Sequence, residues 1–288
     1  MDYVIVLILQ VLYSVASLAL ICAGLAVIFG MMRVINLAHG EFIMLGGFTT
    51  VFATQAGIPI VVSMLIVAPI VVAVIGLMIE RLVVRHLYGR MIDTMLATWG
   101  LSLLLIGAAT MLFGNSVAGI SAPFGSFTVG QYGVSVYEMF IVAVTVLLLI
   151  ACYLLLRFTK LGLIARGTMQ NSEMAASLGI SPSKVYSITF TAGAALNGLA
   201  GALLAPLSGV VPTMGKAYVA KAFITVISGG EAILTGLVSA SGLLGSVGTL
   251  TTFATTPVVG DAALLLAAII LLRFLPNGIT GRFFKGSI

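Results

Sequence analysis

Three polar side chains, Asn36, His39 and Glu41, stand between two long apolar runs near the start of the chain. Because the chain is 61% hydrophobic and only 7% charged, such groups are rare in it. Polar and ionisable side chains are costly at membrane depth, so they usually face the interior of a helix bundle or a water-filled path. Neighbouring glycines would allow a helix to break or to pack closely at this point. We interpret the stretch as a polar hinge around which a solute path is built.

Each candidate group also has a structural interpretation. Glu41 and Glu231 could line a path, bind a substrate amide or pair with a lysine, but a helix cap or a buried hydrogen bond explains an intramembrane carboxylate equally well. His39 is more often an interhelical hydrogen-bond donor than a proton relay. The amides of Asn36 and Asn197 can hydrogen-bond another amide, although Asn197 lies in a glycine-rich stretch that favours close helix packing. The residues that we predict to lie near the path are Asn36, His39, Glu41, Asn197 and Glu231.

The composition indicates which elements must position these groups. A mean hydropathy of +1.25 excludes an ordinary soluble domain, in which about half of the residues are apolar and about a quarter are charged. A spanning helix needs about 20 apolar residues, and runs close to that length occur at 3–29, 34–54, 60–80, 93–113, 138–156, 186–206, 233–253 and 260–275. A shorter run at 217–228 either crosses the membrane or re-enters it. We predict an all-α polytopic membrane protein with about eight or nine transmembrane helices, some interrupted or re-entrant, in a single transmembrane domain over residues 1–288.

The basic residues predict the orientation in the membrane. If the short run crosses, eleven of the thirteen lysines and arginines fall on one side, and only Lys216 and Lys221 fall on the other. Because lysine and arginine collect in cytoplasmic loops, we place the N-terminus outside and the C-terminus in the cytoplasm. If the run re-enters, the C-terminal spans flip and three basic residues move outside, so we prefer the crossing. The net charge of +5 is spread over separated loops and does not indicate nucleic-acid binding.

The sequence contains no catalytic or nucleotide-binding pattern. His39 and His86 lie in different loops and lack metal-ligand spacing to cysteine or carboxylate. No Gly-x-x-x-x-Gly-Lys-Ser/Thr loop is present, so we expect no cofactor in this chain, and ATP would have to be bound by partner subunits. A membrane-embedded enzyme is therefore disfavoured. A passive small-solute channel remains the alternative, since it would need the same broken helices and polar midplane.

The segment 157–185 holds much of the remaining polarity and is cytoplasmic in this topology. Asn171 or Ser172 could cap a short helix over Glu173–Leu178, which Gly179 would end in a left-handed conformation.

Met174, Ala175 and Leu178 would form an apolar stripe on this short helix. A short amphipathic helix between two spans suits a partner that binds it in a surface groove. The alternative is that the stripe packs on its own bundle, because Met and Leu stripes more often belong to a core.

The sequence from His39 to Gly47 has a weak echo later in the chain. His39-Gly-Glu-Phe-Ile-Met-Leu-Gly-Gly47 can be compared with Gly229-Gly-Glu-Ala-Ile-Leu-Thr-Gly236. Transporters are often built from repeats whose broken helices meet at the substrate site. The match is short and Gly-Glu is a common dipeptide, so chance explains the echo equally well.

Three stretches resemble a known family. Asn36-Leu-Ala-His-Gly-Glu-Phe-Ile-Met-Leu-Gly46 and Gln170-Asn-Ser-Glu-Met-Ala-Ala-Ser-Leu-Gly-Ile180 are similar to the two signatures of the branched-chain amino acid/urea class of ABC-importer permeases. The tail Arg273-Phe-Leu-Pro-Asn-Gly-Ile279 is similar to the terminal signature of the class. The resemblance implies a transport subunit without enzymatic activity in the bacterial inner membrane. Its implied partners are a second permease, expected to be a paralogue, two cytoplasmic ABC ATPase subunits and an external solute-binding protein.

The same resemblance implies that the stretch from Thr168 to Ile180 is a coupling loop that fits a cleft of an ATPase subunit. The residues expected to transmit ATPase motion are Thr168, Gln170, Asn171, Glu173, Met174, Ala175, Leu178 and Gly179.

The resemblance is less specific about the substrate. Arg85-His-Leu-Tyr-Gly-Arg90 and Asp93-Thr-Met-Leu-Ala-Thr-Trp-Gly-Leu-Ser102 look more like urea and short-chain amide permeases than leucine-type ones. Two departures stand against urea. Gly229-Gly-Glu-Ala232 replaces the usual Gly-Gly-x-Gly, and Lys216 and Lys221 lie near the outside. We expect ATP-driven import of a small polar nitrogenous solute, with urea or a short amide slightly ahead of branched-chain or other small or hydrophobic amino acids.

Overall fold

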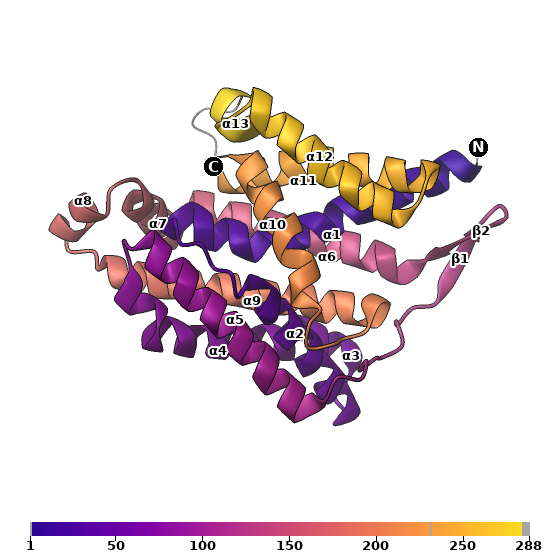
Figure 1. Ribbon diagram of the computed structural model, residues 1–288, viewed down its shortest axis with the longest axis horizontal. Coiled ribbons are helices and arrows are strands. Elements are labelled where there is room, and N and C mark those ends of the chain that lie inside the picture. Colours follow the sequence, from indigo (N-terminus) through magenta and orange to yellow (C-terminus); the bar gives the residue numbers. More distant parts are fainter. Residues whose placement is uncertain (1, 231, 284–288) are drawn as a thin grey trace. The chain divides into compact units, whose positions relative to one another are not determined.

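The computed structural model describes residues 2–230 and 232–283, and most of this part of the chain is helical (Figure 1). Seven runs among the described residues are long and apolar enough to cross a membrane, so the predicted all-α polytopic class is confirmed. They are α1 (Asp2–Met32), Ile60–Leu82, α5 (Met91–Phe113), α6 (Val136–Phe158), α9 (Pro182–Ser208), α11 (Ile233–Ala254) and Pro257–Gly281.

Two of these runs are not uniform helices. The run Ile60–Leu82 consists of a short α3 (Ile60–Val62), a π-helical segment (Ser63–Val67) and α4 (Ala68–Leu82). The run Pro257–Gly281 begins with α12 (Pro257–Phe274) and ends within α13 (Gly278–Phe283).

Two further helices are shorter than a full span. α2 (His39–Gln55) has 17 residues and α10 (Gly215–Gly229) has 15. At about 1.5 Å per residue, neither alone matches the hydrocarbon core of about 30 Å. Each adjoins a non-helical break, at 33–38 before α2 and around Gly230 after α10, so the predicted interrupted segments are present. The apolar run predicted to begin at residue 34 therefore becomes helical only at His39.

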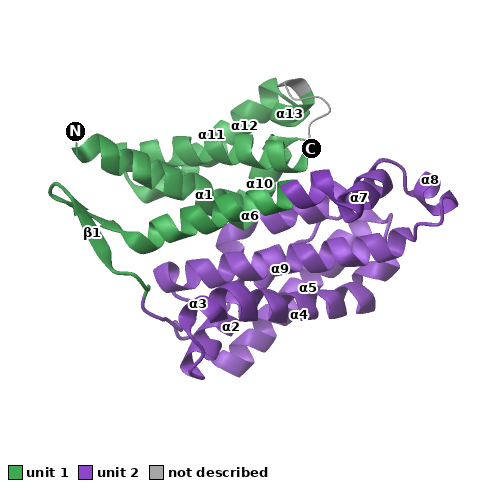
Figure 2. Cartoon of the chain, turned by 180° about the vertical axis from the view of Figure 1, so that it is seen from behind, with its two compact units in different colours: residues 1–22, 122–153, 221–288 green, residues 23–121, 154–220 purple. Residues whose placement is uncertain are grey.

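The chain forms two compact units, coloured separately in Figure 2. Unit 1 contains residues 1–22, 122–153 and 221–288, and unit 2 contains residues 23–121 and 154–220. Three of the four boundaries fall inside α1, α6 and α10, and the fourth falls in the loop between α5 and β1. The prediction of a single domain over residues 1–288 stays a prediction.

Unit 1 contains α11, α12 and α13 together with a β-hairpin that the sequence analysis did not predict. Strands β1 (Ser126–Val129) and β2 (Tyr132–Ser135) pair antiparallel, with Val129 opposite Tyr132 at the turn. Gly130 in this turn has φ +62°, a conformation that glycine adopts without steric cost. Within the same unit Gln10 of α1 donates a hydrogen bond to Glu138 of α6 at 2.8 Å.

Unit 2 is organised around α9, which packs against α2 on one side and α4 on another. Glycines permit this close approach. A Cβ atom on Gly201 of α9 would overlap the carbonyl oxygen of Ile43 in α2, and one on Gly46 would overlap the carbonyl oxygen of Gly198. Because apolar side chains gain little from association in lipid, membrane helices depend on such close backbone packing. The glycines near Glu41 therefore allow α2 to pack closely within the unit. The helix break lies before these glycines in the chain.

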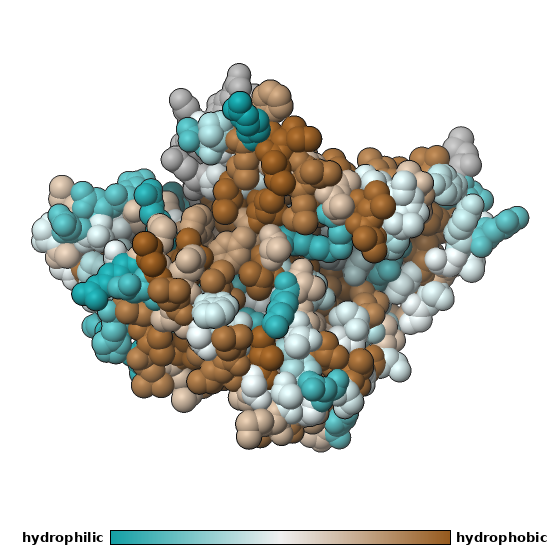
Figure 3. Space-filling model, in the orientation of Figure 1, coloured by the Kyte–Doolittle hydropathy of each residue, from teal (hydrophilic) through white to brown (hydrophobic). Residues whose placement is uncertain are grey.

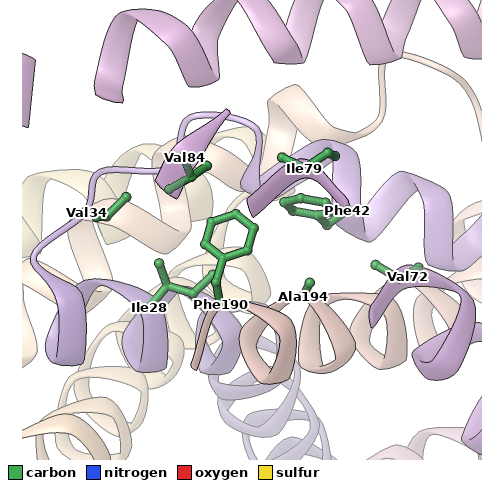
Figure 4. Close-up of a cluster of buried hydrophobic side chains, with 8 residues drawn as sticks. All are labelled: Ile28, Val34, Phe42, Val72, Ile79, Val84, Phe190 and Ala194. Atoms are coloured by element: carbon green, nitrogen blue, oxygen red, sulfur yellow. The ribbon is translucent and has the colours of Figure 1, made fainter. Parts of the chain in front are cut away.

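A cluster of buried apolar side chains completes this contact (Figure 4). Phe190 of α9 projects into it and meets Phe42 of α2 edge-on, with ring centroids 6.0 Å apart and an interplanar angle of 81°. Edge-to-face pairs at this separation are favourable beyond their buried area. The cluster consists of Ile28, Val34, Phe42, Val72, Ile79, Val84, Phe190 and Ala194.

The outer surface of unit 2 is apolar where α4 and α5 lie, and it is polar at the end that carries α7 (Lys160–Gln170) and α8 (Ser172–Ser177) (Figure 3). On α5, Leu104, Met111 and Leu112 are exposed by 63%, 89% and 75%. Exposed apolar side chains in this number suit contact with lipid or with another membrane subunit.

The glycine contact between α9 and α2 can be tested with one methyl group. We expect Gly201→Ala to lower the free energy of unfolding by about 1–3 kcal/mol, because the new Cβ would have to displace the α2 backbone. Gly107→Ala on α5 is the matched control, since its Cβ would meet no atom within 4 Å and the helix gains propensity. Thermal unfolding in detergent measures both variants. Equal stability of the two variants would contradict the proposed packing.

Candidate functional site

The break between α1 and α2 is a defined turn. Arg33 adopts a left-handed conformation with φ +51°. The Asn36 Oδ1 atom accepts a hydrogen bond from the Ala38 N–H at 3.1 Å, and the Asn36 carbonyl oxygen accepts one from the His39 N–H at 3.3 Å. A side chain that bonds the backbone two residues ahead stabilises such a turn. Asn36 therefore has a structural role through its side-chain oxygen.

Thr98 of α5 holds the same break from the neighbouring helix. Its hydroxyl oxygen accepts a hydrogen bond from the Leu37 N–H at 3.1 Å. Its single proton can be donated either to the Met95 carbonyl oxygen of α5 at 3.1 Å or to the Ile35 carbonyl oxygen of the break at 3.3 Å. Backbone groups freed by a broken helix are expensive in a bilayer unless protein groups satisfy them. The fully buried Thr98 side chain therefore satisfies the Leu37 N–H and is placed to reach the Ile35 carbonyl as well.

Thr98 belongs to a hydroxyl stripe along α5 that the sequence analysis missed. Thr94, Thr98 and Ser102 recur every four residues, so they share one helix face, and all three are buried. Between them Leu96 and Trp99 are exposed, whereas Leu101 packs against a cluster of buried apolar side chains. The stripe could have been recognised in the sequence, because hydroxyl side chains recur every four residues within an otherwise apolar helix.

Glu41 lies in the first turn of α2, is 1% exposed and is adjacent to the Ser102 hydroxyl. Its Oε2 atom has no hydrogen-bond partner among the described residues, and the same holds for the Asn36 Nδ2 atom. The N-terminal end of a helix favours a negative charge, and the positive charge of Lys216 also acts on this carboxylate. The break therefore carries an acceptor and a donor that are buried without a hydrogen-bond partner among the described residues.

The start of α10 meets the start of α2 at two glycines. A Cβ atom on either Gly40 or Gly215 would overlap the backbone of the other residue. This contact explains how Lys216, the second residue of α10, comes within reach of Glu41. The sequence placed Lys216 near the outside without assigning it to the path.

The other predicted path residues occupy different positions. His39 is fully buried at the first position of α2. Asn197 of α9 faces α1, where a Cβ atom on Gly24 would overlap its Oδ1 atom, and its amide has no hydrogen-bond partner among the described residues. Glu231 lies outside the described residues. The structure thus gathers Asn36, His39 and Glu41 at one break, and it places Asn197 in the contact between α1 and α9.

The second break, between α10 and α11 in unit 1, is also held by a threonine. The Thr280 hydroxyl donates to the Gly229 carbonyl oxygen at 2.7 Å and accepts from the Ala232 N–H at 3.2 Å. Thr280 directly follows the Arg273–Ile279 motif, and Gly278 packs against Gly230. The terminal motif therefore shapes the segment that contains the sequence echo of the first break.

The segment 157–185 folds into two helices, α7 and α8, of which only the second was predicted. Asn171 caps α8, because its Oδ1 atom accepts a hydrogen bond from the Met174 N–H at 2.9 Å. Gly179 follows with φ +83°, so the predicted cap and terminator are confirmed. Helix α7 is capped in the same way by Thr159, which accepts from the Gly162 N–H at 3.0 Å.

The residues predicted for coupling divide into two groups. Thr168 and Ala175 are buried, and the Thr168 hydroxyl bonds the Ile164 carbonyl oxygen within α7. Met174 and Leu178 are 59% and 75% exposed, so the predicted stripe is divided between an inward Ala175 and two outward side chains. The predicted coupling residues that lie exposed are Gln170, Asn171, Glu173, Met174, Leu178 and Gly179.

The threonine contact with the first break gives a further prediction. We expect Thr98→Val to lower the free energy of unfolding by about 1–3 kcal/mol, since it leaves the Leu37 N–H buried without this acceptor. Thr98→Ser keeps the hydroxyl and should lose much less. Thr145→Val is the control, because the Thr145 hydroxyl bonds only within its own helix, to Ile141. Thermal unfolding in detergent compares the three variants, and a Thr98→Val value equal to the control would exclude this role.

Comparison with known proteins identifies the family. A family described as "Branched-chain amino acid transport system / permease component" matches residues 7–275. The high-affinity branched-chain amino acid transport system permease protein LivH of Salmonella typhimurium is 27% identical over 283 residues, 93% of this chain and 92% of LivH. The permease protein BraD of Pseudomonas aeruginosa, from a transport system of the same description, is 29% identical over 290 residues, with 93% and 92% covered. A probable branched-chain amino acid transport permease protein LivH of Methanocaldococcus jannaschii is 28% identical over 280 residues, with 92% and 88% covered. No solved structure matches significantly.

The family match spans both helix breaks and the segment that forms α7 and α8. It agrees with the seven apolar runs of spanning length and confirms the resemblance found in the sequence motifs. The chain belongs to the family of permease components of branched-chain amino acid transport systems, and it is a multi-pass membrane protein.

Proposed function

We propose that this chain is the membrane subunit of an ATP-driven importer and that its substrate is a branched-chain amino acid. The observation that carries the ATP-driven part is α8, a capped helix between α7 and α9 that presents Met174 and Leu178 outward. A passive channel has no need of such a helix. The names of the matched relatives support branched-chain amino acids in place of the urea preferred from the sequence.

The proposed path begins at the first break. An amino acid carries an ammonium group, which could pair with the Glu41 carboxylate, and a carboxylate, which could accept a hydrogen bond from the Asn36 amide. Pairing would offset the cost of bringing these charges to membrane depth. His39 lies between these two residues in the chain and is buried at the same break.

An apolar groove next to the first break could take an aliphatic side chain. It is open to the outside, has a volume of about 660 Å³ and is lined almost entirely by apolar side chains of α2, α4 and α5, among them the exposed Leu112. Leu45 and Leu105 in its lining lie about one helical turn beyond Glu41 and Ser102, respectively. Such a groove next to a few polar groups would suit a ligand with one polar and one aliphatic end better than it suits urea.

The proposed assembly contains a second permease, expected to be a paralogue, two cytoplasmic ABC ATPase subunits and an external solute-binding protein. It lies in the bacterial inner membrane with the N-terminus outside and the C-terminus in the cytoplasm, as the basic residues predict. ATP binds to the ATPase subunits, and this chain needs no cofactor. The ATPases can drive alternate opening to the two sides only by binding two states of the permease differently.

The role of α8 can be tested by placing charge on its exposed side chains. We expect Met174→Glu combined with Leu178→Glu to reduce ATP-dependent uptake and ATPase co-purification about tenfold or more, as for central contact residues of an interface. Thermal stability should hardly change, because both side chains are exposed.

The control is Met174→Leu with Leu178→Met, which keeps the apolar surface and should bind the ATPase normally. Unchanged co-purification and uptake in the glutamate variant would show that α8 does not bind an ATPase.

A further inference from the structure

The junction between α8 and the helix bundle contains a buried carboxylate that the proposed path does not use. Glu80 lies near the end of α4 and is fully buried. Its Oε1 atom accepts a short hydrogen bond from the Tyr88 hydroxyl, and its Oε2 atom accepts one from the Ser187 hydroxyl at 2.7 Å. No ion pair to Glu80 occurs within the described part of the chain. The two hydroxyl groups thus supply the partners that a buried carboxylate requires.

Tyr88 is a permanent donor in this arrangement. Burial and the hydrogen bond to Glu80 raise the pKa of Tyr88 well above its ordinary value. Its hydroxyl therefore keeps its proton at physiological pH.

Further contacts hold the first turns of α9 against the segment after α4. Ser183, Tyr186 and Ser187 share one face of α9, given their spacing of three and four residues. The Arg85 Nε–H donates to the Ser183 hydroxyl at 2.9 Å. The Tyr186 ring meets the Tyr88 ring at 5.1 Å with an interplanar angle of 69°. We call this set the Glu80 cluster: Glu80, Arg85, Tyr88, Ser183, Tyr186 and Ser187.

The position of the cluster in the chain suggests its use. Helix α9 begins at Pro182, only three residues after Gly179 ends the α8 turn. A displacement of α8 therefore reaches α9 first at the turns that the cluster attaches to α4. Farther along α9, Gly198 and Gly201 contact α2, the helix that carries Glu41.

We infer that Glu80 is a positioning residue that holds the start of α9 to α4, so that a movement of α8 shifts both helices together. Without this attachment, the first turns of α9 would bend alone and the movement would not reach α2. The inference rests on the proposed function, because it requires that an ATPase acts on α8. It assigns Glu80 to the transmission of movement and gives it no contact with the solute.

The test compares Glu80→Gln with Glu138→Gln in the complete complex in vesicles. Glu138 is a matched control, since it also accepts a side-chain hydrogen bond, from Gln10 at 2.8 Å, but belongs to unit 1. The readout is labelled leucine taken up per ATP hydrolysed. We expect about a tenfold decrease for Glu80→Gln, because the amide nitrogen cannot accept the second hydroxyl hydrogen bond and its loss represents about that factor. Glu138→Gln should keep the wild-type ratio.

A wild-type ratio in an assembled Glu80→Gln complex would overturn the inference and leave the proposed function intact. A wild-type complex without ATP-dependent uptake would overturn both. If the Glu80→Gln complex does not assemble, Tyr88→Phe and Ser187→Ala test the inference in its place. Each of these variants removes one hydrogen-bond donor to Glu80. A decreased ratio in these variants supports the role of Glu80, and an unchanged ratio excludes it.

Discussion

The structure depends on one constraint: backbone groups released where a membrane helix breaks must find partners within the protein. At the first break the Asn36 side chain and the Thr98 hydroxyl supply them. At the second break, in unit 1, Thr280 supplies a hydrogen bond to each of two backbone groups. Once these demands are met, the chain can keep polar groups such as Glu41 buried at membrane depth. The polar hinge therefore depends on Thr98 of helix α5 as well as on its own residues.

Helix α9 connects the two ends of the proposed mechanism within unit 2. Its first turns follow α8 and attach to α4 through the Glu80 cluster, and its middle packs on α2 through glycines. Contacts made by glycine leave no flexible side chain between two backbones, so a shift of one helix is passed to the other. This arrangement gives a physical route from the proposed ATPase contact to the break that carries Glu41.

The local features of the fold could be predicted from the sequence. Hydropathy predicted the spanning runs, because their length follows from the thickness of the bilayer. The Asn171 cap and the Gly179 terminator were predictable because capping depends on residues only a few positions apart. The first break was recognised from its polar residues, but its helix begins five residues later than the apolar run suggests.

Features that depend on distant pairing could not be predicted. Thr98 and Glu80 gain their roles from partners on other helices, and hydropathy treats them as isolated polar residues. The role of the α2 glycines also depends on a distant partner, because they pack against α9. From the sequence alone, the same glycines could equally have marked the helix break. Helix α7 and the β-hairpin lie outside the apolar runs, where periodicity gave little information. The two breaks share a short sequence similarity, and each is also held by a threonine, Thr98 at the first and Thr280 at the second. Glu231, which belongs to the second of these stretches, lies outside the described residues.

The most direct test of the account measures uptake of labelled leucine and of labelled urea by vesicles that contain the complete complex. Wild type and Glu41→Gln are compared with and without ATP. The account predicts ATP-dependent uptake of leucine by wild type, little uptake of urea, and a strong decrease of leucine uptake in Glu41→Gln although the complex still assembles. Flux without ATP would indicate a passive channel. Uptake of urea in place of leucine would contradict the substrate, and normal transport by Glu41→Gln would leave that carboxylate a structural group.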